Sequence, residues 1–190
     1  IYSTFSVFGL LIGLGLLVFL YLTFNEINFL EDLKKLLPER ATVLGGIPKA
    51  KNAEEFSVLL VQDEPKGLLA ESFRKIRTNL NYIHPNYLTI AITSSVSGEG
   101  KTFIALNLGG IIAMSGKKTI LLDLDLRKPK VHLAFKADNS KGMSNLIVDA
   151  VQLNECIQHS SIDQLDFITA GPIPPNPSEL ILSNRFRELI

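Results

Sequence analysis

Hydrophobic side chains dominate the first 24 residues, and no charged side chain interrupts the run from Phe5 to Phe24. A helix of about 20 residues rises about 30 Å, which matches the hydrocarbon core of a bilayer. The run is apolar on every face, unlike an amphipathic core helix, and it lacks the basic start of a signal peptide. The pattern therefore predicts a transmembrane helix over residues 1–24.

Residues 25–65 mix polar and apolar positions, which predicts a juxtamembrane linker. Within it, Ile27–Leu37 has the spacing of a short amphipathic helix that Pro38 would end. The segment Thr42–Pro48 predicts an extended piece followed by a turn. Basic residues follow the hydrophobic run, so the positive-inside rule favours a cytoplasmic location for residues from 25 onward.

From residue 66 the chain alternates helical and strand patterns. Leu69, Phe73, Ile76 and Leu80 recur at the spacing of one helix face. The β-branched run Leu88–Thr93 has the composition of a buried strand. Such alternation predicts an α/β fold with a mostly parallel sheet flanked by helices. The predicted helices cover 66–82, 103–115, 143–150 and a segment capped by Ser178, and the predicted strands cover 88–93, 118–127 and 165–170.

Charge and cysteine content narrow the class of protein. The 190 residues carry 19 Lys and Arg against 19 Asp and Glu. A neutral chain offers no general basic surface, so we expect no nucleic-acid partner. The single cysteine, Cys156, excludes an internal disulfide and fits a reducing compartment.

Residues Ser95–Thr102 have the form of the Walker A phosphate-binding loop, with Ser in place of its first Gly. The loop lies between a predicted strand and a predicted helix, which is the context that the motif requires. Small residues let backbone N–H groups surround a phosphate, and the helix N-terminus adds partial positive charge. Lys101 would reach the β and γ phosphates, and the Thr102 hydroxyl would bind Mg²⁺. The predicted nucleotide-binding residues are Ser95, Val96, Ser97, Gly98, Glu99, Gly100, Lys101, Thr102 and Phe103.

The strand predicted over 118–127 carries two carboxylates at its end, Asp123 and Asp125. A two-residue period points both to one side of the strand, at the carboxyl edge of the sheet where ligands bind. Two carboxylates beside a triphosphate would repel it unless a divalent cation lay between them. They are therefore predicted as Mg²⁺ ligands or as a base for an incoming hydroxyl. The alternative is that they cap the following turn.

Three further charged residues, Glu71, Arg74 and Arg77, recur at three-residue steps along the predicted helix 66–82. From spacing alone, the simplest interpretation is a solvated face with an i,i+3 ion pair worth a few tenths of a kcal/mol.

Together these motifs resemble the bacterial tyrosine kinases (BY-kinases) of capsule and exopolysaccharide export. The resemblance rests on the Walker A loop, on Leu-Leu-Asp123-Leu-Asp125-Leu-Arg127 as the Walker A′ motif, and on Pro174-Pro-Asn-Pro-Ser-Glu-Leu180. Glu71-x-x-Arg74-x-x-Arg77 is similar to the oligomerisation motif of that family. The hydrophobic run followed by Val-Leu-Gly-Gly-Ile-Pro48 resembles the last membrane span of a fused chain-length-determinant portion.

The resemblance implies an ATP- and Mg²⁺-dependent protein-tyrosine autokinase in the bacterial inner membrane, with residues 66–190 as the first part of a cytoplasmic kinase domain. Lys101, Asp123 and Asp125 would be catalytic, and one aspartate would help to deprotonate a tyrosine of a neighbouring subunit. Glu71, Arg74 and Arg77 would hold that neighbour in a ring. The implied partners are further copies of this chain and the polysaccharide export machinery. A Walker B strand and a tyrosine cluster are expected beyond Ile190.

Two other functions remain open at this level. Partitioning and division-site ATPases share the fold, but their Walker A loop carries a signature lysine at its second position, where this chain has Val96. The second alternative is a non-enzymatic polysaccharide co-polymerase that binds nucleotide as a structural or regulatory ligand.

Overall fold

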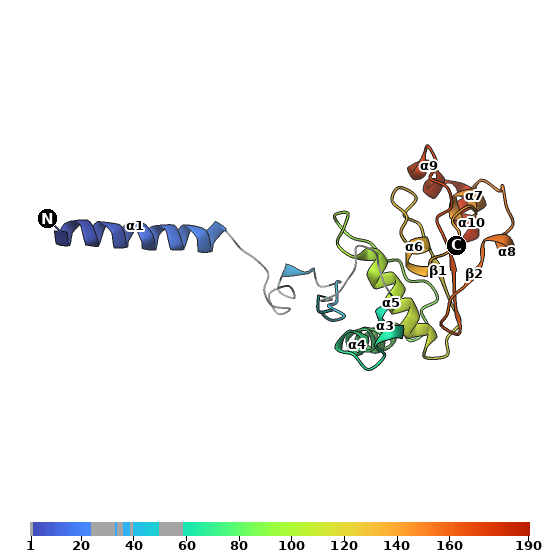
Figure 1. Cartoon of the computed structure of the whole chain (residues 1–190), viewed down its shortest axis with the longest axis horizontal. Helices are drawn as coiled ribbons and strands as arrows, with labels where there is room; N and C mark the ends of the chain where they lie inside the picture. The colour runs from blue at the N-terminus through green and yellow to red at the C-terminus, as the bar shows by residue number, and fades with distance from the viewer. Residues whose placement is uncertain (1, 24–32, 34–35, 39, 50–58) are drawn as a thin grey trace. The chain divides into compact units, whose positions relative to one another are not determined.

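The computed structural model describes residues 2–23, 33, 36–38, 40–49 and 59–190 (Figure 1). The chain divides into two compact units, residues 1–43 and residues 44–190. The boundaries predicted for an anchor, a linker and a kinase domain remain predictions.

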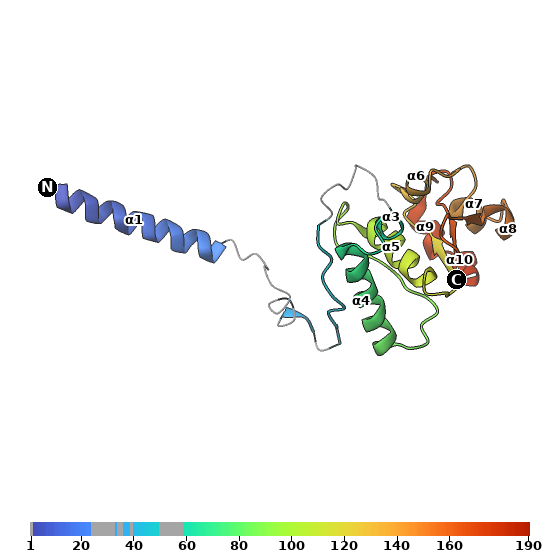
Figure 2. The same ribbon diagram turned by 60° about the horizontal axis from the view of Figure 1, so that its bottom comes forward.

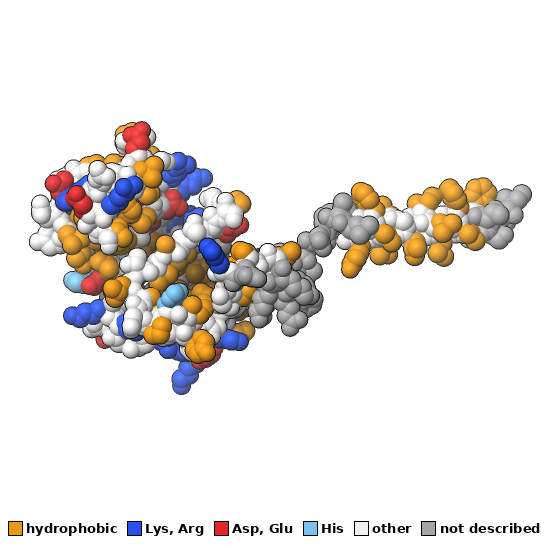
Figure 3. All heavy atoms as spheres, turned by 180° about the vertical axis from the view of Figure 1, so that it is seen from behind, with side chains coloured by type: hydrophobic (Ala, Val, Ile, Leu, Met, Phe, Trp, Pro, Cys, Tyr) orange, Lys and Arg blue, Asp and Glu red, His pale blue; other side chains and the backbone are white. Residues whose placement is uncertain are grey.

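The first unit contains helix α1, Tyr2–Thr23, which has 22 residues. Its side chains are described from Phe5 to Tyr21, and all of them are exposed. Figure 3 shows hydrophobic side chains along both edges of this helix. Within the described residues, no helix combines the length and the hydropathy that a membrane span needs. The transmembrane helix therefore stays a prediction, and most of the short helix predicted at Ile27–Leu37 lies outside the described residues.

The second unit contains a three-stranded sheet of order β1-β3-β2. Strands β1, Thr119–Leu122, and β3, Leu165–Ile168, are parallel. Strand β2, Gln158–His159, is antiparallel to β3. The helices are α3 Leu60–Asp63, α4 Leu68–Ile83, α5 Lys101–Ala113, α6 Val131–Phe135, α7 Met143–Ile147, α8 Leu153–Cys156, α9 Pro177–Leu182 and α10 Asn184–Leu189.

The sheet lies between two layers of helices (Figure 2). Alternate strand residues point to opposite faces, so Leu165 and Phe167 join one core and Ile168 joins the other. The first core lies under α4 and α5 and includes Phe73, Leu106 and Ile111. The second core lies on the side of α7 and includes Leu126, Met143, Leu146, Ile147 and Cys156.

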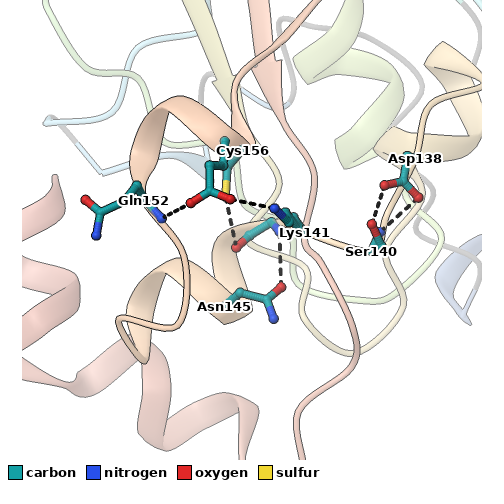
Figure 4. Close-up of polar contacts among 8 residues, drawn as sticks. Asp138, Ser140, Lys141, Asn145, Gln152 and Cys156 are labelled. Carbon is teal, nitrogen blue, oxygen red and sulfur yellow. Dashed lines mark hydrogen bonds and ion pairs between the residues drawn. The ribbon is translucent and has the colours of Figure 1, made fainter.

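Polar contacts hold the loop before α7 against α8 (Figure 4). The Lys141 ammonium donates to a Glu155 carboxylate oxygen at 2.5 Å, and the other oxygen accepts from the Gln152 N–H at 3.1 Å. Cys156 is buried beside them, and burial raises the pKa of its thiol. The thiol is therefore a packing group of low reactivity.

The strand predicted at Leu88–Thr93 is not formed, and this segment has no regular secondary structure. Leu88 is 98% exposed, while Ile90 and Ile92 are partly buried against the first core. A strand needs backbone hydrogen bonds along at least one edge. Among the described residues, no segment supplies such a partner to 88–93. The prediction was wrong because it used local composition, whereas strand formation depends on a neighbour.

Other predicted elements agree more closely. The helices predicted at 66–82 and 103–115 correspond to α4 and α5, and the strands at 118–127 and 165–170 correspond to the shorter β1 and β3. Ser178 was wrongly predicted as a helix cap, because α9 begins after Asn176 with Pro177 at its first position. The Ser178 hydroxyl instead accepts a hydrogen bond from Arg127 at 2.9 Å.

A buried amide joins α3 to α5. The Asn107 side chain is fully buried, and its Oδ1 accepts from the Val61 N–H at 3.0 Å. Its Nδ2 donates to the Phe103 carbonyl at 2.9 Å. The Val61 N–H lies in the first turn of α3, where a helix offers no partner of its own. Asn107 therefore satisfies a donor that would otherwise be buried without an acceptor.

We expect Asn107→Ala to lower the free energy of unfolding by about 2 kcal/mol, because the Val61 N–H loses its acceptor in an apolar environment. Asn154→Ala, at an exposed position of α8, is the matched control and should change it by less than about 0.5 kcal/mol. Urea unfolding measures both values. Equal losses of unfolding free energy in the two variants would show that the buried Asn107 amide contributes no more to stability than an exposed one.

Candidate nucleotide-binding site

The Walker A loop leads directly into the first turn of α5. Gly98 has φ 95° and Gly100 has φ 93°, values in the left-handed region that side chains with a Cβ disfavour. No atom lies within 4 Å of a Cβ built at either position. Backbone conformation, and not lack of space, therefore requires glycine at these two positions.

The Glu99 side chain braces the first half of the loop. Its Oε2 accepts hydrogen bonds from the backbone N–H groups of Ser95 at 3.0 Å and Val96 at 3.2 Å. The Ser94 hydroxyl donates to the Val96 carbonyl at 2.8 Å. Sequence reasoning assigned only the backbone of Glu99 to the site and missed this role of its carboxylate. The available signal was a carboxylate four residues after the start of the motif.

Lys101 and Thr102 begin α5. The Lys101 ammonium donates to the Ser94 hydroxyl at 3.0 Å, so the side chain folds back over the loop. A cation at a helix N-terminus lies unfavourably close to the positive end of the helix dipole. An anion bound there would offset the charge of the Lys101 ammonium and the partial charge of the helix N-terminus. Phe103 points away from the loop, because its ring packs on Phe73 in the core, with 6.0 Å between ring centroids.

Asp123 and Asp125 follow β1 and accept hydrogen bonds from the next turn. Asp123 is 5% exposed, and its two oxygens accept from the N–H groups of Asp125 at 3.1 Å and Val131 at 3.3 Å. Asp125 accepts from the Lys128 N–H at 3.0 Å. These hydrogen bonds agree with the alternative interpretation, in which the two aspartates cap the following turn. Each carboxylate oxygen has two lone pairs, so these bonds leave capacity to bind a cation.

Burial raises the pKa of Asp123 from 3.8 to about 6, and the nearby charge of Asp125 adds to the effect. Backbone hydrogen bonds from Asp125, Val131 and Lys130 act in the opposite direction. A buried carboxylate that is costly to ionise gains most from a nearby cation. Oxygen donors of this kind suit Mg²⁺, which prefers carboxylates together with phosphates and water.

The structure connects residues within each half of the site. Within the described part of the chain, no group of three or more His, Cys, Asp or Glu residues could hold a metal by itself. Nor does a hydrogen bond or ion pair between described residues link the Walker A loop to the two aspartates. Thr102, Asp123 and Asp125 offer oxygen donors, and a Mg²⁺ site built from them would also need the phosphates of a nucleotide.

The three residues predicted for oligomerisation lie on α4 but do not share one environment. Arg74 forms an ion pair with Glu71 at 2.5 Å and also donates to the Pro65 carbonyl. The Glu71 side chain is 61% exposed. Arg77 turns inward and donates to the Ile111 carbonyl of α5 at 2.9 Å.

Residues 90–171 match the CobQ/CobB/MinD/ParA nucleotide binding domain. The chain is 41% identical over 133 residues to tyrosine-protein kinase YwqD of Bacillus subtilis (strain 168), covering 69% of this chain and 56% of that protein. The structure of the chimerical protein CapA2B2 has a TM-score of 0.73 at 40% identity, covering 84% of this chain and 67% of that one. The kinase domain of Escherichia coli tyrosine kinase ETK has a TM-score of 0.67 at 31% identity, covering 78% and 63%.

The fold and the loop thus define a P-loop nucleotide-binding protein of the α/β class. Within that class, the chain belongs to the family of bacterial tyrosine-protein kinases of capsule and exopolysaccharide biosynthesis, as the sequence motifs predicted. The chain spans little more than half of the length of YwqD.

The raised pKa of Asp123 makes stability depend on pH. Between about pH 4 and pH 6 the folded state binds more protons than the unfolded state, so the free energy of unfolding falls as pH rises. The loss levels off above about pH 6 and totals about 3 kcal/mol. Asp123→Asn removes this contribution, so its stability relative to wild type should rise across that window. Urea unfolding without Mg²⁺ or nucleotide measures the difference.

Asp163→Asn, at an exposed position, controls for the loss of one negative charge. A stability difference between Asp123→Asn and wild type that stays constant from pH 4 to pH 7 would contradict the assignment.

Proposed function

We propose that this chain is part of a membrane-anchored, ATP- and Mg²⁺-dependent protein-tyrosine kinase that regulates capsule or exopolysaccharide polymerisation and export. One observation carries the proposal: a Walker A loop with left-handed glycines and a buried aspartate after β1 occur in the same fold. The names of YwqD and ETK, both tyrosine kinases, support it.

Each site residue has a proposed role. Backbone N–H groups of the loop, including those of Gly98, Glu99 and Gly100, would bind phosphate oxygens, and Lys101 would neutralise the β and γ phosphates. Mg²⁺ supplies charge neutralisation between these phosphates when bound. Thr102, Asp123 and Asp125 would hold the ion.

An aspartate of the same pair would accept the proton of the attacking tyrosine hydroxyl. A base is most effective when its pKa is close to the working pH. Without a bound cation, the pKa of Asp123 is raised to about 6, which is nearer to that range than the pKa of an exposed aspartate. Asp125 lies two residues further along the same turn and would share the metal-binding role.

A partitioning-type ATPase is the second candidate, because the matched nucleotide-binding domain family includes MinD and ParA. In that case water would accept the phosphoryl group. Val96 at the second position of the loop favours the kinase. Release of phosphate without formation of phosphotyrosine would favour the ATPase, and nucleotide binding with neither product would favour a non-enzymatic co-polymerase.

The kinase proposal predicts that Lys101→Met and Asp123→Asn each reduce tyrosine phosphorylation at least about 100-fold, because each removes charge stabilisation at the transferred phosphoryl group. The assay uses the full-length protein, Mg²⁺ and labelled ATP, with a tyrosine-rich peptide as an additional acceptor. Lys118→Met, which changes an exposed lysine before β1, is the matched control. Undiminished phosphotyrosine in either site variant would exclude the assigned roles.

Self-association and membrane anchoring complete the proposal. Glu71, Arg74 and Arg77 on α4 would contribute to contacts between copies in a ring, which would bring a tyrosine of one subunit to the site of the next. The 22-residue helix α1 and the uncharged run Phe5–Phe24 support an anchor in the inner membrane, with the kinase unit in the cytoplasm.

The anchor proposal predicts that Leu14→Arg combined with Leu17→Arg releases the protein from membranes. An arginine near the centre of a span costs about 3 kcal/mol on insertion scales. After expression in a bacterium, carbonate-washed membranes should retain the wild type and lose most of this double variant. Leu153→Arg, at an exposed leucine of α8, is the control and should behave as wild type. Equal retention of all three would argue against an anchor at residues 1–24.

A further inference from the structure

Helix α4 contacts α5 near both ends of α5. Near the start of α5, the fully buried ring of Phe73 packs against Phe103, the residue directly after Thr102. One turn further along α4, the Arg77 guanidinium donates to the Ile111 carbonyl at 2.9 Å. Ile111 lies two residues before the end of α5. The helix that begins at the Walker A lysine is thus held at its beginning and near its end by one neighbour.

The Arg77 contact fills a specific gap in the hydrogen bonding of α5. The last four carbonyls of a helix have no partner within it. Three of the four in α5 accept from the turn that follows: Gly110 from the Met114 N–H, Ile112 from the Ser115 N–H and Ala113 from the Gly116 N–H. The Ile111 carbonyl accepts from Arg77. A guanidinium there also complements the negative end of the helix dipole.

The position of α5 matters because its first turn carries the phosphate-binding groups. A helix is stiff along its axis, so a displacement at its end is transmitted to Lys101 and Thr102 at its start. Groups that bind phosphate work within about 0.5 Å of the productive geometry. Contacts that fix α5 therefore influence nucleotide affinity even when they lie far from the loop.

We propose that Arg77 is a positioning residue for the nucleotide site and acts within its own subunit, through the Ile111 carbonyl. The inference rests on the proposed nucleotide-binding function, and it gives Arg77 a role that does not require a neighbouring copy.

The test measures nucleotide affinity under conditions in which the full-length protein is monomeric. Sedimentation identifies such a concentration in detergent, and calorimetry with Mg²⁺ and ADP gives the dissociation constant. We expect Arg77→Met to bind about fivefold more weakly than wild type, because the end of α5 loses its charged hydrogen-bond donor. Arg77→Lys, which keeps a cationic donor, should recover part of the affinity. Lys75→Met, at an exposed cation of the same helix, should bind as wild type.

A second control separates positioning from general loss of stability. Ile76→Val shortens a buried side chain beside Arg77 and lowers stability without touching the Ile111 carbonyl. It should leave the dissociation constant within about twofold of wild type. Wild-type affinity in monomeric Arg77→Met, or equal weakening in Ile76→Val or Lys75→Met, would overturn the inference and leave the kinase proposal intact. If the wild type itself binds no nucleotide, the proposed function fails instead.

Discussion

Burial of α5 is the constraint on which the rest of the second unit depends. Eight consecutive residues, Leu106–Ala113, are buried, so the helix must be enclosed on every side. The sheet covers one side, and α3 and α4 cover others. Gly110 permits close approach to α3, since a Cβ there would lie 3.0 Å from a methyl carbon of Val61. The first five residues of α5, Lys101–Ala105, are only partly buried, and the Walker A loop ends in this turn.

The electrostatics of the site follow from this enclosure. The loop ends in a lysine at the positive end of a helix, and the turn after β1 buries a carboxylate whose pKa is raised to about 6. Each half of the site is electrostatically unfavourable alone. The Lys101 ammonium lies at the positive end of the helix dipole, and the negative charge of Asp123 is removed from water. A phosphate chain carrying Mg²⁺, the ligand that the proposed function requires, would offset both, although no contact among the described residues joins the loop to the two aspartates.

Local patterns predicted those parts of the structure that local forces determine. The apolar period of α4 and the helix that follows the Walker A motif depend on neighbours within a few residues, and both helices were predicted correctly. The segment 88–93 has the same local character, but a strand also needs a partner, and composition does not supply one. Asn107 and the inward contact of Arg77 depend on residues brought together by folding. No spacing along the chain marks these contacts.

The motif on α4 shows how helix geometry divides one sequence pattern between two environments. A helix turns about 100° per residue, so steps of three residues drift by about 60° each. Arg77 therefore lies about 120° around the helix from Glu71. It lies only about 40° from Phe73, four residues earlier. Since Phe73 is fully buried, a motif that starts on the exposed side must end close to the core. The Glu71 side chain therefore remains exposed, and the Arg77 guanidinium reaches the Ile111 carbonyl of α5.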